Sequence, residues 1–187
     1  ELAQDALAVI AIGTCASFGG IPAAPPNPTK CVSVQKALEM KGIKKPIINV
    51  AGCPPHPDWF VGTVASIILN GLPKADELDD FLRPKAFYGQ LIHENCPRRA
   101  YFDEGKFAKK FGDEGCLYEL GCKGPITHAD CPNRKWNGGT NWVIGAGAPC
   151  NGCTQPEFPH ETSPFYEKLT DVELPVVGAY WAKKEVK

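Results

Sequence analysis

Nine cysteines constrain this chain more than any other feature, because their number is odd and six of them lie beyond residue 83. An odd count excludes a complete set of internal disulfides and leaves metal ligands, a catalytic thiol or a mixture of the two. The cysteine-rich half, about 100 residues long, shows little hydrophobic periodicity, and such a segment needs cross-links, such as metal ligation, to stay folded.

Composition narrows the class of protein further. Glycine (19) and proline (18) supply 37 of 187 residues, so much of the backbone must lie in turns and loops, while 43% hydrophobic residues suffice for a core. A net charge of −1 argues against nucleic acid or an anionic membrane as the main partner. No run of 18 apolar residues exists, so we expect no membrane span. There is no initiator Met and no signal peptide, and we expect the chain to begin inside a domain.

Residues 1–82 show an α/β pattern. Two short apolar runs, Ala6–Ile12 and Pro46–Val50, are typical of buried parallel strands. Helices are predicted over Ser33–Met40, over Trp59–Leu69 with Asp58 as its cap and Asn70-Gly71 as its end, and over Ala75–Leu82. This order predicts a doubly wound sheet, whose ligands bind beyond the carboxyl ends of the strands.

Each predicted strand is followed by a loop that contains a cysteine. Cys15 lies in GTCASFGG (residues 13–20), and Cys53 lies in AGCPPHP (residues 51–57). Because the loops occupy equivalent positions on neighbouring strands, we expect the two thiols to lie close together.

Residues 83–187 form a second predicted unit, with one helix expected over Glu104–Phe111. Its potential ligands fall into two groups. The first is His93, Cys96, Cys116 and Cys122, and the second is Cys131, Cys150 and Cys153. A CxxC turn directs two thiolates to one point, which suits zinc or an iron–sulfur cluster. A zinc-stapled structural or binding module is therefore one interpretation. The wide Cys116-x5-Cys122 pair and the lack of a fourth ligand in the second group weigh against it.

The ordered motifs resemble those of the small, electron-transferring subunit of nickel–iron hydrogenases, a family that includes the nickel–iron–selenium type. The resemblance covers almost the whole chain from Ala8 to about Tyr166. It is carried by GTCASFGGIP (13–22), GCPPHPDW (52–59), HENCP (93–97), ELGCKGP (119–125), DCP (130–132), the pairs Trp136-Asn137 and Asn141-Trp142, and AGAPCNGC (146–153).

The resemblance implies a partial flavodoxin-like domain (residues 1–82) followed by a loop-rich, mostly irregular iron–sulfur domain (residues 83–187). It implies three clusters. Cys15 and Cys53 would supply half of a proximal [4Fe–4S] site. The distal [4Fe–4S] cluster would be bound by His93, Cys96, Cys116 and Cys122, and the medial [3Fe–4S] cluster by Cys131, Cys150 and Cys153.

Two departures from the family pattern matter. The family's remaining proximal ligands form a CxxC near the start of the subunit, which this sequence lacks, so we expect the N-terminal part to be missing and the proximal site to be completed from outside these residues. Val143 stands where family members have proline with a three-iron medial cluster or cysteine with a four-iron one. Because valine supplies no ligand, a [3Fe–4S] cluster is favoured.

The implied function is electron relay. Hydrogen would be split into protons and electrons at the nickel–iron site of a large subunit, and this chain would pass the electrons to an external carrier such as a multihaem c-type cytochrome. The periplasm is the expected compartment, with the cytoplasm as the alternative. A quinone-reductase-type iron–sulfur subunit is a second interpretation, disfavoured because those relatives lack the region from His93 to Cys153.

The remaining candidates have ordinary explanations. Cys31 matches no ligand motif and is expected to be a plain thiol. His56 is expected to position its loop rather than bind metal, and His128 and His160 to be polar loop residues. Trp136 and Trp142 are expected to pack around the medial site, and Lys183, Lys184 and Lys187 to form a solvated tail.

Overall fold

The structure, a computed structural model, describes residues 1–168. The predicted tail of Lys183, Lys184 and Lys187 lies outside the described residues. Within them, no helix is both long and apolar enough to cross a membrane.

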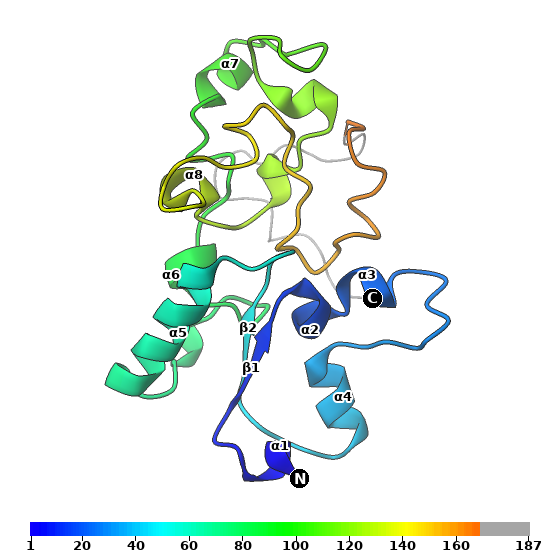
Figure 1. Ribbon diagram of the computed structural model, residues 1–187, viewed down its shortest axis with the longest axis vertical. Coiled ribbons are helices and arrows are strands. Elements are labelled where there is room, and N and C mark those ends of the chain that lie inside the picture. Colours follow the sequence, from blue (N-terminus) through cyan, green and yellow to red (C-terminus); the bar gives the residue numbers. More distant parts are fainter. Residues whose placement is uncertain (169–187) are drawn as a thin grey trace.

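A two-stranded parallel sheet organises the first half. Strand β1 (Val9–Ile12) pairs with β2 (Ile47–Val50), with Val9 opposite Ile47 and Ile12 opposite Val50. Both predicted strands are therefore present, although β1 is shorter than the apolar run because the preceding residues form helix α1 (Leu2–Asp5) and a turn. Their parallel direction places both carboxyl ends at the same edge, which faces the second half of the chain (Figure 1).

Helices flank this sheet. Helices α2 (Thr14–Phe18), α3 (Gly20–Ala23) and α4 (Val34–Met40) lie to one side of it, and α5 (Pro57–Asn70) lies to the other (Figure 1). Ser33 caps α4 by accepting a bond from Lys36 N–H, as its position predicts. The cap of α5 is His56 and not Asp58, because the imidazole Nδ1 accepts the Asp58 N–H.

Short turns replace two of the predicted helices. Of the helix predicted over residues 75–82, the structure contains a single 3₁₀ turn, η1 (Ala75–Glu77), and the rest of the prediction is wrong. The helix cannot continue because Leu78 pairs with Pro84 and Leu82 has a positive φ of 59°. The helix expected over 104–111 is also wrong. Helix α7 lies earlier, at Arg99–Asp103, and the chain turns at Gly105, whose φ is 69°.

The second half contains only short elements among the described residues. These are α6 (Lys85–Tyr88), α7, η2 (Leu117–Leu120), η3 (Gly124–Ile126) and α8 (Cys131–Arg134). The chain between them is irregular, as its Gly and Pro content predicts. The observed fold is thus mixed α/β with a small parallel sheet.

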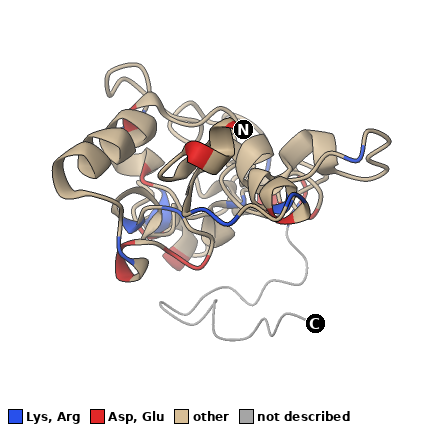
Figure 2. Ribbon diagram, turned by 90° about the horizontal axis from the view of Figure 1, so that it is seen from below, with Lys and Arg blue, Asp and Glu red and all other residues tan. Residues whose placement is uncertain are grey.

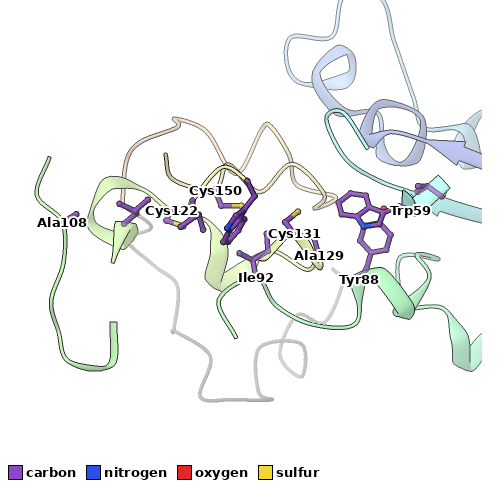
Figure 3. Close-up of a cluster of buried hydrophobic side chains, with 12 residues drawn as sticks. Trp59, Tyr88, Ile92, Ala108, Cys122, Ala129, Cys131 and Cys150 are labelled. Atoms are coloured by element: carbon purple, nitrogen blue, oxygen red, sulfur yellow. The ribbon is translucent and has the colours of Figure 1, made fainter. Parts of the chain in front are cut away.

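The core of the molecule runs from the sheet into the second half. Three of its buried side chains are thiols, and Figure 3 shows Cys122, Cys150 and Cys131 following one another along this core toward Trp59. The two halves are joined by buried polar bonds, including Tyr88 Oη to Ala51 O at 2.7 Å and Trp59 Nε1 to Asp130 Oδ1 at 2.7 Å. The cysteine-bearing loops are therefore part of the core and not appended to it.

Candidate metal centres

The first ligand group is brought together at one pocket. His93 and Cys96 come from the turn after α6, Cys116 precedes η2, and Cys122 follows it. All four line the same pocket, with apolar walls that include Ile92, Leu117 and Ile144. His93 and Cys96 thus meet two cysteines that lie 20 to 29 positions further along the sequence. The free volume left between them is small, about 10 Å³, which is room for one water molecule.

Burial decides the ionisation of these four groups. It raises the pKa of the Cys96 and Cys116 thiols and raises that of Cys122 to about 11. Burial, helped by the Arg99 charge, lowers the pKa of His93 to about 4. His93 is therefore neutral near pH 7, the form that binds metal, whereas the thiols need a cationic centre to become thiolates.

The second ligand group surrounds a larger cavity. Cys131 begins α8, and Cys150 and Cys153 lie on the CxxC turn. All three thiols line a cavity of about 210 Å³, walled by Trp136, Trp142, Val143 and other residues. Burial, together with the neighbouring thiols, raises the pKa of Cys131 to about 12 and that of Cys150 well above its usual range. This donor set fits a polynuclear cationic centre, which would compensate several closely spaced thiolates at once.

Cys15 and Cys53 form a separate, open pair. Cys15 lies on α2 directly after β1, and Cys53 directly follows β2. Both are exposed, and they are close enough for Cys15 to raise the pKa of Cys53, after burial. The structure thus brings these two thiols together at the carboxyl edge of the sheet, as their equivalent loop positions predict.

Backbone contacts connect the three sets of thiols. Cys53 lines the 210 Å³ cavity beside Cys153, and its backbone N–H partly offsets the rise that burial gives the pKa of the Cys153 thiol. At the other end, Lys123 N–H donates to Cys150 O at 2.7 Å, so the residue after Cys122 is bonded to the CxxC turn. The set formed by Cys131, Cys150 and Cys153 therefore lies between the other two.

The rings of His56, Trp59 and Trp136 pack together beside Cys131. The His56 ring lies 4.6 Å from Trp136 and 5.7 Å from Trp59, centroid to centroid. His56 Nδ1 accepts the Asp58 N–H, so Nε2 carries the proton and donates to Lys135 O at 2.8 Å. Both ring nitrogens are thus engaged, which supports the positioning role predicted for His56. The Trp136 side chain beside Cys131 partly offsets the rise that burial gives the pKa of that thiol.

No group of three or more His, Cys, Asp or Glu side chains in residues 1–168 is arranged to hold a single metal ion. Cys31 stands apart from all three sets, with its Sγ 3.1 Å from Thr29 Oγ1. Sequence reasoning missed Thr14 and Arg83, two buried polar residues that bond to the Cys153–Thr154 backbone. Their partners lie 139 and 71 positions away, and no local pattern signals such pairs.

Comparisons with known proteins show the family to which this chain is similar. Residues 88–166 match the family described as the C-terminal part of the NiFe/NiFeSe hydrogenase small subunit, and residues 1–67 match the NADH ubiquinone oxidoreductase 20 kDa subunit family. The periplasmic NiFeSe hydrogenase small subunit of Desulfomicrobium baculatum is 48% identical over 170 residues, which is 89% of this chain and 54% of that one. The F420 non-reducing hydrogenase II small subunit of Methanosarcina mazei is 42% identical, over 96% of this chain and 50% of that one.

Solved structures show the same relationship. The NiFeSe hydrogenase structure from Dm. baculatum aligns with a TM-score of 0.84 at 48% identity, covering 90% of this chain and 62% of that one. An actinobacterial-type NiFe hydrogenase from Ralstonia eutropha H16 aligns with a TM-score of 0.83 at 36% identity, covering 96% and 54%. This chain spans about half the length of the curated relatives it matches.

The fold and the relatives define a class, the iron–sulfur subunits of oxidoreductases. Within that class the chain is a homologue of the small subunits of NiFe and NiFeSe hydrogenases over nearly its whole length, which confirms the family predicted from the ordered motifs. The match of its second half to a hydrogenase family disfavours the quinone-reductase interpretation, while the match of its first half reflects the domain that the two groups share.

Proposed function

We propose that this chain is part of the electron-transferring small subunit of a nickel–iron hydrogenase. The main support for this proposal is the arrangement of the thiols. The ligands predicted for each site line one pocket or lie together at the carboxyl edge of the sheet, and the three sites adjoin in one row. When bound, iron–sulfur clusters accept and release one electron at a time. We also propose that residues 1–82 are part of a flavodoxin-like domain and that the iron–sulfur domain begins at residue 83.

His93, Cys96, Cys116 and Cys122 would hold the distal [4Fe–4S] cluster. The donor set fits, since a neutral imidazole replaces one thiolate and reduces the negative charge at the site. The Gly124 N–H donates to Cys122 Sγ at 3.4 Å, a bond that stabilises added electron density on sulfur.

Cys131, Cys150 and Cys153 would hold the medial [3Fe–4S] cluster. Their cavity has room for it, and Val143 lines that cavity without offering a ligand. The indoles of Trp136 and Trp142 exclude water from its walls, and the Gly152 N–H donates to Cys150 Sγ at 3.5 Å. The N–H donor favours the reduced state of a bound cluster, because it stabilises the charge added on sulfur.

Cys15 and Cys53 would be two ligands of the proximal [4Fe–4S] cluster, with the others supplied from outside these residues. Their exposure leaves the site open for such a contribution. The partner would be a large subunit that carries the nickel–iron centre, where hydrogen is split. Three relatives are named as periplasmic hydrogenase small subunits, which supports a periplasmic location, and a multihaem c-type cytochrome is the proposed electron carrier there.

Purification of the native complex tests this function. We expect a nickel-containing large subunit, stoichiometric iron and acid-labile sulfide, and hydrogen-dependent reduction of an artificial acceptor. A colourless complex containing zinc, without nickel or sulfide, would establish the zinc-stapled module instead.

A further inference from the structure

Thr14 lies where the proposed proximal and medial sites meet. It directly precedes Cys15, and its side chain is almost fully buried, with 1% of the residue exposed. Its hydroxyl contacts two other loops, each of which carries a proposed ligand: the Cys53 loop through Gly52, and the Cys153 loop through the Cys153 carbonyl. One hydroxyl group therefore joins three cysteine-bearing loops.

The bonds of Thr14 extend the sheet beyond its last residue. Gly13 N–H donates to Val50 O at 2.8 Å, and Thr14 N–H donates to Gly52 O at 2.9 Å. Gly52 N–H returns a bond of 2.9 Å to Thr14 Oγ1, so this side chain takes the place of a strand carbonyl. The Gly52 backbone is thereby fixed against the Cys15 loop on both its polar groups.

The hydroxyl hydrogen connects this extension to the second half of the molecule. Because Thr14 Oγ1 accepts from Gly52, its own hydrogen is free to donate, and it donates to Cys153 O. Cys53 and Cys153 also line the same cavity, so the two loops adjoin there. The Thr14 bond leaves the ligand sulfurs untouched, so it can be removed without removing a ligand.

We propose that Thr14 is a positioning residue that sets the separation between the Cys15/Cys53 site and the Cys131/Cys150/Cys153 site. The inference rests on the proposed function. Electron tunnelling slows steeply as the distance between two centres grows, so the loops that hold the centres need a rigid connection. Without the hydroxyl, Gly52 N–H and Cys153 O each lose a hydrogen-bond partner. The equilibrium constant for the linked arrangement of the loops then falls roughly tenfold or more.

Three variants of the complete, cluster-loaded hydrogenase complex test this role. Thr14→Val removes the hydroxyl and keeps the shape, and Thr14→Ser keeps the hydroxyl. Thr63→Val is the matched control, because Thr63 is also a buried threonine, but its hydroxyl donates to Trp59 O within α5 and joins no cysteine loops. The readouts are the distance-dependent EPR splitting between the proximal and medial clusters and the rate at which the medial cluster is reduced after hydrogen is added.

We expect Thr14→Val alone to change the splitting and to slow medial reduction, while Thr14→Ser and Thr63→Val match the wild type. Loss of clusters from Thr14→Val alone would also support the role, since only the linking hydroxyl distinguishes it. Wild-type splitting and rate in Thr14→Val, or equal changes in Thr14→Ser, would overturn it. A wild-type complex without two interacting clusters would instead contradict the proposed function itself.

Discussion

Arg83 is a buried charge at the joint between the two halves. Only 1% of its side chain is exposed; its Nε donates to Asp79 Oδ2 at 2.7 Å and its Nη1 to Thr154 O at 2.8 Å. The rings of Phe81 and Tyr88 lie 5.1 and 5.2 Å from the guanidinium. Removing such a residue lowers the stability of the fold chiefly because its former partners are left without their hydrogen-bond donor.

We predict that Arg83→Met destabilises the subunit by about 3 kcal/mol, because it removes the charged partner of the half-buried Asp79 carboxylate and the side-chain donor of the buried Thr154 carbonyl. For a chain of this size the loss corresponds to a fall in Tm of roughly 6–12 °C, measured on the purified complex. Lys36→Met is the control: the Lys36–Glu39 pair is more than half exposed and 3.7 Å long, so its loss costs less than about 0.5 kcal/mol. Equal effects of the two substitutions would contradict this assignment.

His128 gives the molecule a sensitivity to acid. Burial, with the nearby Arg83 charge, lowers its pKa to about 4 from an unfolded value of 6.5. The folded state therefore binds fewer protons than the unfolded chain between pH 6.5 and 4, and stability falls as pH falls through that range. The sequence interpretation of His128 as an ordinary polar loop residue missed this burial.

We predict that lowering the pH from 7 to 5 costs about 1 kcal/mol through His128, after allowance for its partial exposure. The measurement is Tm at both pH values for the wild type and for His128→Gln. The glutamine variant should lose less stability over the same interval. An identical pH dependence would show that another group is responsible.

Individual residues were predictable only where their role is local or follows a motif. Ser33 is the expected helix cap, and the proposed ligands meet in the expected groups. His56 replaces Asp58 as the α5 cap because an imidazole nitrogen accepts as well as a carboxylate does, and the surrounding prolines fix its backbone. Thr14 and Arg83 could not be predicted, since their partners come from distant loops.

At the scale of elements, the junction of α2 and α3 holds Cys15 in place. Gly20 begins α3 with a φ of 52°, and a Cβ there would lie 2.9 Å from the Cys15 backbone and 3.0 Å from its Sγ. Contact with backbone atoms cannot be relieved by turning a side chain. The glycine is therefore required both for its conformation and for the close approach of the two turns.

We predict that Gly20→Ala displaces Cys15 and lowers the iron content of the proximal site, with an altered EPR signal of that cluster. Gly42→Ala is the matched control. Gly42 also has a positive φ, 67°, but a Cβ there meets nothing within 4 Å, so its cost is limited to about 1 kcal/mol of backbone strain. Normal proximal iron in Gly20→Ala would rule out this role.

Elements were predictable where a hydrophobic pattern and a stop signal coincide. Helix α5 ends before Gly71 as predicted, and both strands fall within their apolar runs. The segment from 99 to 111 has no such pattern. There, α7 stops at Gly105, and the following residues are held by long-range bonds such as Ala108 N–H to Cys116 O at 3.0 Å. Tertiary contacts, not local preference, determine that part of the backbone.

At the scale of the whole molecule, the two halves differ in what stabilises them. The first half has a paired sheet and the 14-residue helix α5, whereas the described part of the second half has helices of at most five residues around buried thiols. Charged residues of both signs are spread along the ribbon, and Asp58 is the one charged residue of α5 (Figure 2). The second half should therefore depend more strongly on bound clusters.

We predict that removing iron and sulfide under anaerobic conditions loosens residues 84–168 before residues 1–82. Limited trypsin digestion with mass spectrometry should show new cleavage at exposed basic residues near the distal pocket, Lys106, Lys109 and Lys110, while cleavage at Lys36 and Lys41 is unchanged at first. Identical cleavage maps for the loaded and stripped complexes would show that the clusters do not stabilise this half.

The central claim is that the thiols of the second half form two distinct sites, a medial one with three ligands and a distal one with four. The EPR spectrum of the oxidised native complex tests it most directly. We expect the signal of an oxidised [3Fe–4S] cluster from Cys131, Cys150 and Cys153, beside an EPR-silent oxidised [4Fe–4S] cluster that becomes paramagnetic on reduction. An oxidised complex that contains iron and sulfide but shows no three-iron signal would contradict it.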